Sequence, residues 1–563
     1  DALIPVHFAA RDDNRLVNLV VQRVPDMSLG VSMGNELGAM LPGAAAWFLG
    51  ALALMILLTA CFNYVGLTVS RAMKRSREVG VRKVFGAARS HITVQFIIEA
   101  VAISSLSVLV AVGLLRWMVP SFNSMSFVSQ TGMTLLVDYG SDLGLYGVIL
   151  IFTLTVGLIA GLYPALFLSR FQPADAVKGM TDRSGKGGSA LRKSLVVIQF
   201  SLSLIFVIVT LTMSRQANFM QQADYGFAQS NIINVRLFDV PFERFRDGLA
   251  SSSSVERVSG ISNIPALGSR SDRWVSNAGM AIEDRVKAYQ YAIDENLVET
   301  LELDLIAGTN LTPEMDFTTS RRVLVNEKLL QRLNLGAAAD AVGESFIMGD
   351  STVLSIAGVL RDFNTDPLTS AISPNLFVYD TASISWANVR LVPGRLEDGV
   401  EDIKAAWTAM GHPRQVDYAV FEAQLKDNFV NLLVRDMYRL IGFIAMLTVI
   451  IACLGLLGIA SFNVERRTRE ISIRKVLGAE VSGLVRMLSR EFLILIGIAA
   501  VVSIPIAWVA STFFLQAFEY RVNMGVGTVA LGLFAILAVT LSIIGSQTVK
   551  AALSNPVDNL HEN

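Results

Sequence analysis

Four acidic residues form the grouping in this chain that could do acid–base chemistry: Asp294, Glu295, Asp362 and Asp366. General acid–base catalysis uses such carboxyl groups as a pair around a reacting bond. The sequence offers no nucleophile, metal ligand or second feature beside them. We therefore expect solvated loop carboxylates and assign no catalytic residue.

Metal and nucleotide chemistry find no better support. The histidines and cysteines are scattered without HExxH or related spacing, and both cysteines lie in apolar runs: His7, His91, His412, His561, Cys61 and Cys453. The SGKGG sequence at 184–188 lacks the GxxxxGK[ST] spacing of a phosphate-binding loop. We expect a flexible linker there, no metal site, and no cofactor bound by this chain.

One basic segment occurs twice and could serve as a binding element. Arg77–Ala87 reads REVGVRKVFGA and Arg469–Ala479 reads REISIRKVLGA, with seven of eleven positions identical. The same offset pairs Ser90 with Ser482. Such agreement indicates an internal repeat, which determines how the rest of the chain is interpreted.

Each copy predicts a short amphipathic helix, a sharp turn and a new helix. Apolar residues at i, i+3 and i+4 form one edge, and basic residues take the other side. Gly86 and Gly478 stand where a helix needs a left-handed C-terminal residue, and Ser90 and Ser482 can cap the following helix. The apolar edge comprises Val81, Val84, Phe85, Ile473, Val476 and Leu477, and the basic side Arg82, Lys83, Arg474 and Lys475.

Composition places the repeat in a membrane protein. The 563 residues are 52% hydrophobic and 17% charged, and the net charge of −1 argues against a nucleic-acid partner. Membrane helices need about 20 apolar residues. Seven runs are long enough: Ala44–Val69, Thr93–Val119, Leu143–Leu168, Leu195–Met213, Leu440–Asn463, Phe492–Leu515 and Gly527–Thr548.

Loop charge predicts the orientation. Lys and Arg crowd 71–89 and 466–484, whereas the connections 121–142 and 516–526 are poor in them. The positive-inside rule makes the first pair cytoplasmic and the long stretch 214–437 extracytoplasmic. Strand-like runs (IINVRL, VKAYQYAI, RRVLVN, TVLSIAGVL, NLFVYD, NVRLV) and helix-like runs (FERFRDGLASSSSVERV, NEKLLQRLNL, LEDGVEDIKAAWTAM) in that stretch predict an α+β domain.

The repeat, the spans and the long insert together resemble an FtsX/MacB-type (type VII) ABC transporter permease. LVNEKLLQRLNL, AVGESF, GVLRDFN and ISPNLF are similar to the MacB-type periplasmic core domain. In that family the short basic helix is a coupling helix held in a groove of the ATPase. The resemblance therefore implies ATPase contacts for Arg77, Glu78, Val81, Arg82, Lys83, Val84, Phe85, Gly86, Arg469, Glu470, Ile473, Arg474, Lys475, Val476, Leu477 and Gly478.

The implied layout is a tandem-fused, eight-span form in which one span and most of a first extracytoplasmic domain are missing. Residues 1–40 would be the tail of that domain. The remaining segments would be a first membrane block (41–170, coupling helix 71–89), a cytoplasmic linker (171–193), a fourth visible span (194–213), a periplasmic core domain (214–437), a second membrane block (438–548, coupling helix 466–484) and a cytoplasmic tail (549–563).

Three features inside the spans carry separate expectations. Glu99 and Glu491 each lie in the opening turns of a span, where they either pair with a coupling-helix Arg or Lys, or sit near the helix N-terminus within reach of interfacial water. Gly157 and Gly161 form a GxxxG close-packing signal, and Pro505 should kink the sixth span.

By this resemblance the chain is a non-catalytic inner-membrane permease of an ATP-driven export or mechanotransmission complex. A separate ABC ATPase, present as two copies, binds ATP and Mg, and a periplasmic adaptor and an outer-membrane channel are further candidate partners. The alternative is a non-transporting regulator that activates a periplasmic cell-wall hydrolase. An ion-coupled transporter is disfavoured because the spans hold essentially no charged side chains at mid-depth. No residue selects a substrate.

Overall fold

The computed structural model describes residues 43–125, 128, 134–137, 143–169, 185–267, 271–277, 280–318, 321–349, 351–466, 473–474, 477 and 480–553. These residues divide into two compact units. One holds the chain up to Leu211, Arg439–Val509 and the segment from Gly525, and the other holds Thr212–Tyr438 and Ala510–Met524. The first unit is helical and the second contains the sheet.

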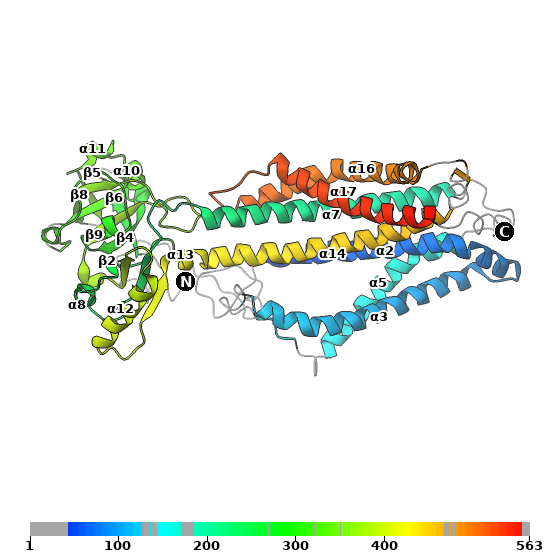
Figure 1. Ribbon diagram of the computed structural model, residues 1–563, viewed down its shortest axis with the longest axis horizontal. Coiled ribbons are helices and arrows are strands. Elements are labelled where there is room, and N and C mark those ends of the chain that lie inside the picture. The colour runs from blue at the N-terminus through cyan, green and yellow to red at the C-terminus, as the bar shows by residue number, and fades with distance from the viewer. Residues whose placement is uncertain are drawn as a thin grey trace. The chain divides into compact units, whose positions relative to one another are not determined.

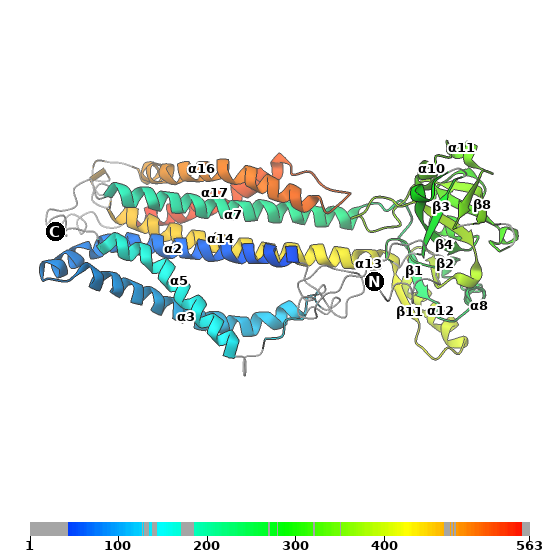
Figure 2. The same cartoon turned by 180° about the vertical axis from the view of Figure 1, so that it is seen from behind.

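Seven helices in the described part of the chain are long and apolar enough to cross a membrane. All seven predicted spans are therefore confirmed, each within a longer helix (Figures 1 and 2). The helices are α2 (Gly43–Val84), α3 (Arg89–Asn123), α5 (Leu143–Ser169), α7 (Gly185–Gln222), α14 (Phe429–Arg466), α16 (Val481–Leu515) and α17 (Val526–Leu553).

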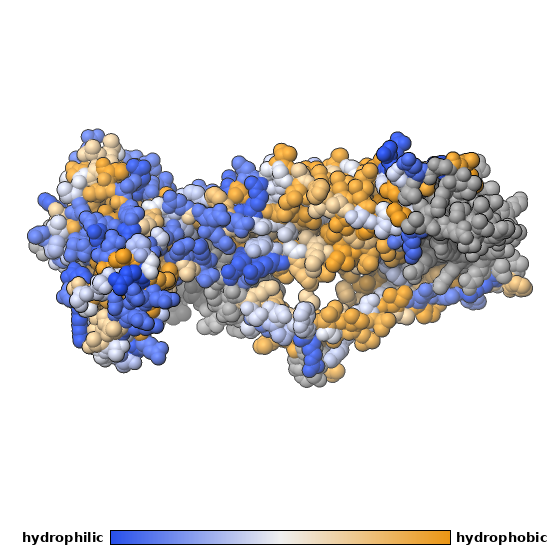
Figure 3. All heavy atoms as spheres, in the orientation of Figure 1, coloured by the Kyte–Doolittle hydropathy of each residue, from blue (hydrophilic) through white to orange (hydrophobic). Residues whose placement is uncertain are grey.

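Helix α7 is the most enclosed of them, since 56% of its apolar stretch is buried inside the protein, against 6% of the apolar stretch of α3. The Ser203 hydroxyl donates to the Thr448 carbonyl of α14 at 3.2 Å, and the Ser201 hydroxyl donates to the Ala499 carbonyl of α16 at 3.3 Å. Apolar side chains cover the outer faces of α16 and α17 (Figure 3). The second block therefore packs around α7 and presents hydrocarbon outward.

The GxxxG signal marks a real contact. A Cβ added at Gly161 would lie 2.6 Å from the Ala100 Cβ, and one added at Gly157 would lie 2.9 Å from the Val101 Cα, both on α3. The two glycines therefore let α5 approach the α3 backbone closely, as small residues do between membrane helices.

Two expectations about helix boundaries were wrong. The first coupling segment is not a separate short helix, because α2 runs unbroken from the span to Val84. No proline interrupts that stretch, so nothing ends the helix before Gly86. The SGKGG sequence is not a linker throughout, since Gly185 to Gly188 open α7. Pro505 lies inside α16, and its kink stays a prediction.

In the described residues, the second unit is built on one sheet of eleven strands. They are β1 (Ile232–Arg236), β2 (Val255–Ile261), β3 (Ser271–Ser276), β4 (Val286–Ile293), β5 (Leu305–Gly308), β6 (Arg322–Asn326), β7 (Ser345–Met348), β8 (Thr352–Leu360), β9 (Asn375–Tyr379), β10 (Trp386–Leu391) and β11 (Asp417–Val420). Strands β4, β3, β7, β8, β6 and β9 close a ring, because β9 pairs with β4 in parallel. The row β11-β1-β10-β2 continues from β4.

Short helices cover this sheet and complete an α+β domain. The ring packs against α10 (Glu327–Leu333) around Phe346 and Leu329, and the β1-β10-β2 part packs against α8 (Phe242–Leu249) and α12 (Leu396–Ala409) around Phe245 and Trp407. The other helices are α9 (Leu297–Thr300), α11 (Ala338–Ala341) and α13 (Phe421–Lys426).

All six predicted strand runs are strands, and the helices predicted near 326–335 and 396–410 are present. The helix predicted over 242–258 is wrong in its second half, where Val255–Ile261 forms β2. The four serines at 251–254 end α8, because short hydroxyl side chains compete for backbone hydrogen bonds.

Candidate docking site on the repeated basic segments

The first basic segment ends in a tight turn that its sequence specifies. The Gly86 N–H donates to the Lys83 carbonyl and the Ala87 N–H donates to the Arg82 carbonyl, each at 3.0 Å. Gly86 has φ of +93°. These paired bonds form a Schellman motif, in which glycine supplies the left-handed residue. The role expected of Gly86 is confirmed, and Gly478 lies outside the described residues.

The turn presents an uncovered apolar side chain in each copy. Phe85 is 87% exposed and Leu477 is 80% exposed, while Ile473 is 47% exposed. In the second copy the Leu477 N–H donates to the Ile473 carbonyl at 3.0 Å, so this part is helical as expected. Large apolar groups beside basic ones, outside the predicted spans, are suited to a protein contact.

The repeat extends to tertiary contacts. The Arg82 Nη1 donates to the Gln95 Oε1 at 3.0 Å, across the turn from α2 to α3. The Arg474 Nη1 approaches the Met487 Sδ at 2.9 Å in α16. Arg474 and Met487 are the repeat equivalents of Arg82 and Gln95. In both copies the arginine thus anchors the turn to the following helix.

Charge at the first turn is concentrated near the helix end. Arg82 and Lys83 occupy the last turn of α2, where cations interact favourably with the helix dipole. Burial lowers the pKa of the Lys83 amine, and the positive charge of Arg89 lowers it further. Arg82 and Lys83 therefore form a cationic rim beside Phe85.

Two expectations for the following helices need correction. Ser90 does not cap α3, which starts at Arg89 with Ala88 as its N-cap and no side-chain cap bond. Ser482 is the second residue of α16, and its hydroxyl bonds the Glu480 carboxylate at 3.1 Å. Each helix begins two residues earlier than it would with the serine as its N-cap.

Glu491 forms an ion pair, but with a partner different from the expected one. Its carboxylate lies 2.8 Å from the Lys193 Nζ in α7, which is not a coupling-segment residue. The pair links the fourth and sixth spans near the ends that we expect to be cytoplasmic. Glu99 is exposed on α3.

Several predicted contact residues lie beyond what the structure describes. The side chains of Arg77, Glu78, Val81 and Val84 fall in this group, although α2 includes all four positions. Arg469, Glu470, Lys475 and Val476 are likewise outside the described residues. Their ATPase contacts stay predictions.

Two of the four acidic residues of the sheet domain are buried, which corrects the expectation of solvated carboxylates for them, while Glu295 and Asp362 are half-buried. Asp294 and Asp366 are 0% and 1% exposed. The Asp294 Oδ1 accepts from the Gly260 N–H at 2.9 Å, and Glu295 pairs with the Arg246 Nη1 at 3.2 Å. Burial raises the pKa of the Asp294 carboxyl group to about 7. These contacts are structural, and among the described residues no group of three metal-ligating side chains accompanies them.

This burial predicts a pH-dependent stability. Between pH 4 and pH 7 the Asp294 carboxyl ionises in the unfolded chain but stays protonated in the folded one, so wild-type stability falls as pH rises through this window. Asp294→Asn removes the loss and should stabilise the domain at pH 8 by a few kcal/mol, on the order of 1.4 per pKa unit, but not at pH 4. Thermal unfolding from pH 4 to pH 8 measures this. Asp284→Asn, at an exposed carboxylate, is the control, and equal pH profiles for Asp294→Asn and wild type would contradict the prediction.

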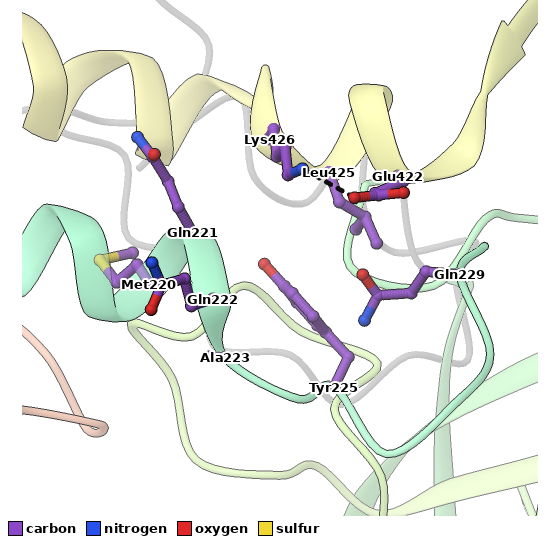
Figure 4. A pocket seen from close by; sticks show the side chains of 9 residues that line it. All are labelled: Met220, Gln221, Gln222, Ala223, Tyr225, Gln229, Glu422, Leu425 and Lys426. Carbon is purple, nitrogen blue, oxygen red and sulfur yellow. Dashed lines mark hydrogen bonds and ion pairs between the residues drawn. The ribbon is translucent and has the colours of Figure 1, made fainter.

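A cavity of about 420 Å³ lies in the second unit between the end of α7 and α13. In Figure 4 the Tyr225 and Gln229 side chains point into it, opposite the Glu422–Lys426 ion pair of 2.7 Å. The full lining is Met220, Gln221, Gln222, Ala223, Tyr225, Gln229, Glu422, Leu425 and Lys426. Amides, a phenol and an ion pair can bind polar groups, but they supply no reaction.

The two basic segments and the spans around them match a known family. The family model described as FtsX-like permease C-terminal matches residues 50–173 and 442–556. The chain carries two FtsX-like permease blocks. Each FtsX-like block contains one basic segment and the three predicted spans around it, which agrees with the internal repeat.

Curated relatives agree with the FtsX-like assignment. The chain is 31% identical over 137 residues to the uncharacterized ABC transporter permease YvrN of Bacillus subtilis (strain 168), covering 24% of this chain and 30% of YvrN. It is 25% identical over 250 residues to the macrolide export ATP-binding/permease protein MacB of Shewanella sp. (strain ANA-3), covering 41% of this chain and 35% of MacB. The chain thus spans about a third of these relatives' length. The matches support an ABC permease of the FtsX/MacB type.

Solved structures also show likenesses. The periplasmic region of MacB from Actinobacillus actinomycetemcomitans has 12% identity and a TM-score of 0.27, covering 36% of this chain and 94% of that chain. The extracellular domain of the noncanonic ABC-type transporter YknZ from Gram-positive bacteria has 13% identity and a TM-score of 0.26, covering 34% of this chain and 100% of that chain.

Proposed function

We propose that this chain is the inner-membrane permease of an ABC complex in which ATP hydrolysis by a partner ATPase moves the sheet domain outside the membrane. The observation that carries the proposal is the pair of exposed apolar residues, Phe85 and Leu477, at equivalent positions of the two FtsX-like blocks. Two equivalent contacts suit two ATPase subunits, which would bind the ATP and Mg.

The polar groups of the helical unit support work done outside the bilayer. Gln199 is 4% exposed, and its amide donates to the Thr59 carbonyl at 3.4 Å. Ser201 and Ser203 bond backbone carbonyls of neighbouring helices. These groups are used in helix packing, whereas a polar substrate would need them to replace its hydration. The substrate would then be handled in the periplasm or outer leaflet.

The proposed sidedness has a direct test in intact cells. Single cysteines at Ser76, Thr468 and the exposed Ser351 replace serine or threonine in a chain lacking Cys61 and Cys453. An impermeant thiol reagent should label position 351 in intact cells, and positions 76 and 468 only after lysis, because the basic segments lie inside. Labelling at 76 or 468 without lysis would overturn the topology and the proposed function with it.

Purification of the native complex separates export from regulation. An adaptor and outer-membrane channel accompanying the ATPase would support export, and a cell-wall hydrolase in their place would support the regulator alternative.

A further inference from the structure

The segment joining α16 to α17 is part of the second unit, where it packs against the base of the sheet domain. Phe518 is 5% exposed in a cluster with Phe421 and Leu425 of α13. The Glu519 N–H donates to the Thr369 carbonyl at 3.3 Å. The Tyr520 side chain hydrogen-bonds that of Asn364. Residues 516–524, here called the α16–α17 loop, are thus held by several contacts.

One side chain of α7 fastens this loop at both of its functional groups. Gln216 is fully buried. Its Nε2 donates to the Tyr520 carbonyl at 2.8 Å, and its Oε1 accepts from the Val522 N–H at 2.9 Å. A primary amide has the donor and acceptor needed to bond both backbone groups at once.

Loss of this amide would leave two half-buried backbone groups of the loop without their partner. An unsatisfied buried N–H or carbonyl is costly, so the loop would separate to reach water. Gln222, six residues further along the same helix, is exposed. Position 222 therefore offers a matched control for position 216 on the same helix.

The outer connection of the first FtsX-like block is fastened differently. The Asn123 Nδ2 donates to the Leu135 carbonyl at 3.0 Å, and the Leu135 N–H donates to the Asn123 Oδ1 at 2.8 Å. This amide therefore bonds a residue in the connection that directly follows its own helix, α3. The comparable clamp in the second block joins the loop to another helix, α7.

We propose that Gln216 is a positioning residue that ties the α16–α17 loop to α7 beneath the sheet domain, so that the outer end of the second block follows the domain in each ATP cycle. The hydrogen bonds of the clamp lie within the second unit. The coupling to the ATP cycle rests on the proposed function, because it requires an ATP-driven movement.

Spin labels test the clamp in the purified full chain without any ATPase. Cysteines at the exposed Asn523 and Ser351, both in the second unit, carry the labels in a chain lacking Cys61 and Cys453. Gln216→Met should broaden the narrow distance distribution of the clamped loop. Gln222→Met and Asn123→Met, the matched controls, should leave it narrow.

Gln216→Glu distinguishes the hydrogen bonds from general packing. A protonated glutamic acid can donate to the Tyr520 carbonyl and accept from the Val522 N–H, whereas the carboxylate can only accept. The distribution should therefore narrow at pH 5 and broaden at pH 8 for this variant, and stay broad at both for Gln216→Met. Narrow distributions in every variant would overturn the clamp.

The coupling of the α16–α17 loop to the ATP cycle is measured separately, with the partner ATPase bound. Gln216→Met should keep ATPase binding and lose the ATP-dependent change in distance between labels at Asn523 and Leu143. An unaltered change would overturn the coupling role. If wild type shows no ATP-dependent change between Ser351 and Leu143, the proposed function fails, while the widths of the Asn523–Ser351 distance distributions still test the clamp.

Discussion

Replacing both Phe85 and Leu477 with aspartate should abolish co-purification of the partner ATPase and its stimulation by this chain. Both side chains are exposed, at 87% and 80%, so the exchange should leave the helical unit intact. In the proposed complex they are the buried anchors, and loss of such an anchor costs about 2 kcal/mol or more. A new carboxylate in each contact adds a desolvation cost.

Matched variants separate the anchors from their surroundings. Leu136→Asp alters an apolar side chain that is 91% exposed on the connection expected outside the membrane, and it should leave ATPase binding unchanged. Arg82→Ala and Arg474→Ala should each cost below about 1 kcal/mol, and less at high salt, because rim charges are screened. Binding by the double aspartate variant equal to that of wild type would refute the docking assignment.

The sequence predicts the parts of this site that depend on local rules. The repeat alone predicts both turns, and the first is confirmed by the left-handed conformation of Gly86 just after α2. The seven spans follow from apolar runs as long as a bilayer requires. The continuation of α2 past the membrane was missed, although no proline lies between the span and Gly86 to end the helix.

Contacts between distant segments could not be predicted in the same way. The equivalence of Arg82–Gln95 and Arg474–Met487 appears once the turns are folded, although the common spacing of 13 residues was available as a signal. The hydrogen bond that the buried Asp294 accepts comes from Gly260, which lies 34 residues away. Strands of four residues such as β5 and β7 are too short for alternation to identify.

The second large effect is expected from a lock between the fourth and fifth spans. A Cβ added at Gly442 in α14 would lie 3.3 Å from the Thr210 Cγ2 in α7. The two positions therefore face each other in van der Waals contact, and we expect cysteines there to reach the Cβ separation of about 3.8 Å that a disulfide needs. The locked chain, without Cys61 and Cys453, should bind the ATPase but lose the ATP-driven movement, because these spans connect the sheet domain to the FtsX-like blocks. Reduction of the disulfide should restore it.

The central claim is that ATP hydrolysis moves the sheet domain, and a distance measurement tests it most directly. Spin labels at Ser351 and at Leu143, carried by encoded noncanonical residues, report on the complex with its ATPase. Trapping ATP should shift the distance in the unlocked and reduced chains and leave it fixed in the Thr210→Cys/Gly442→Cys disulfide. No shift in the unlocked chain, or the same shift in the locked one, would contradict the account.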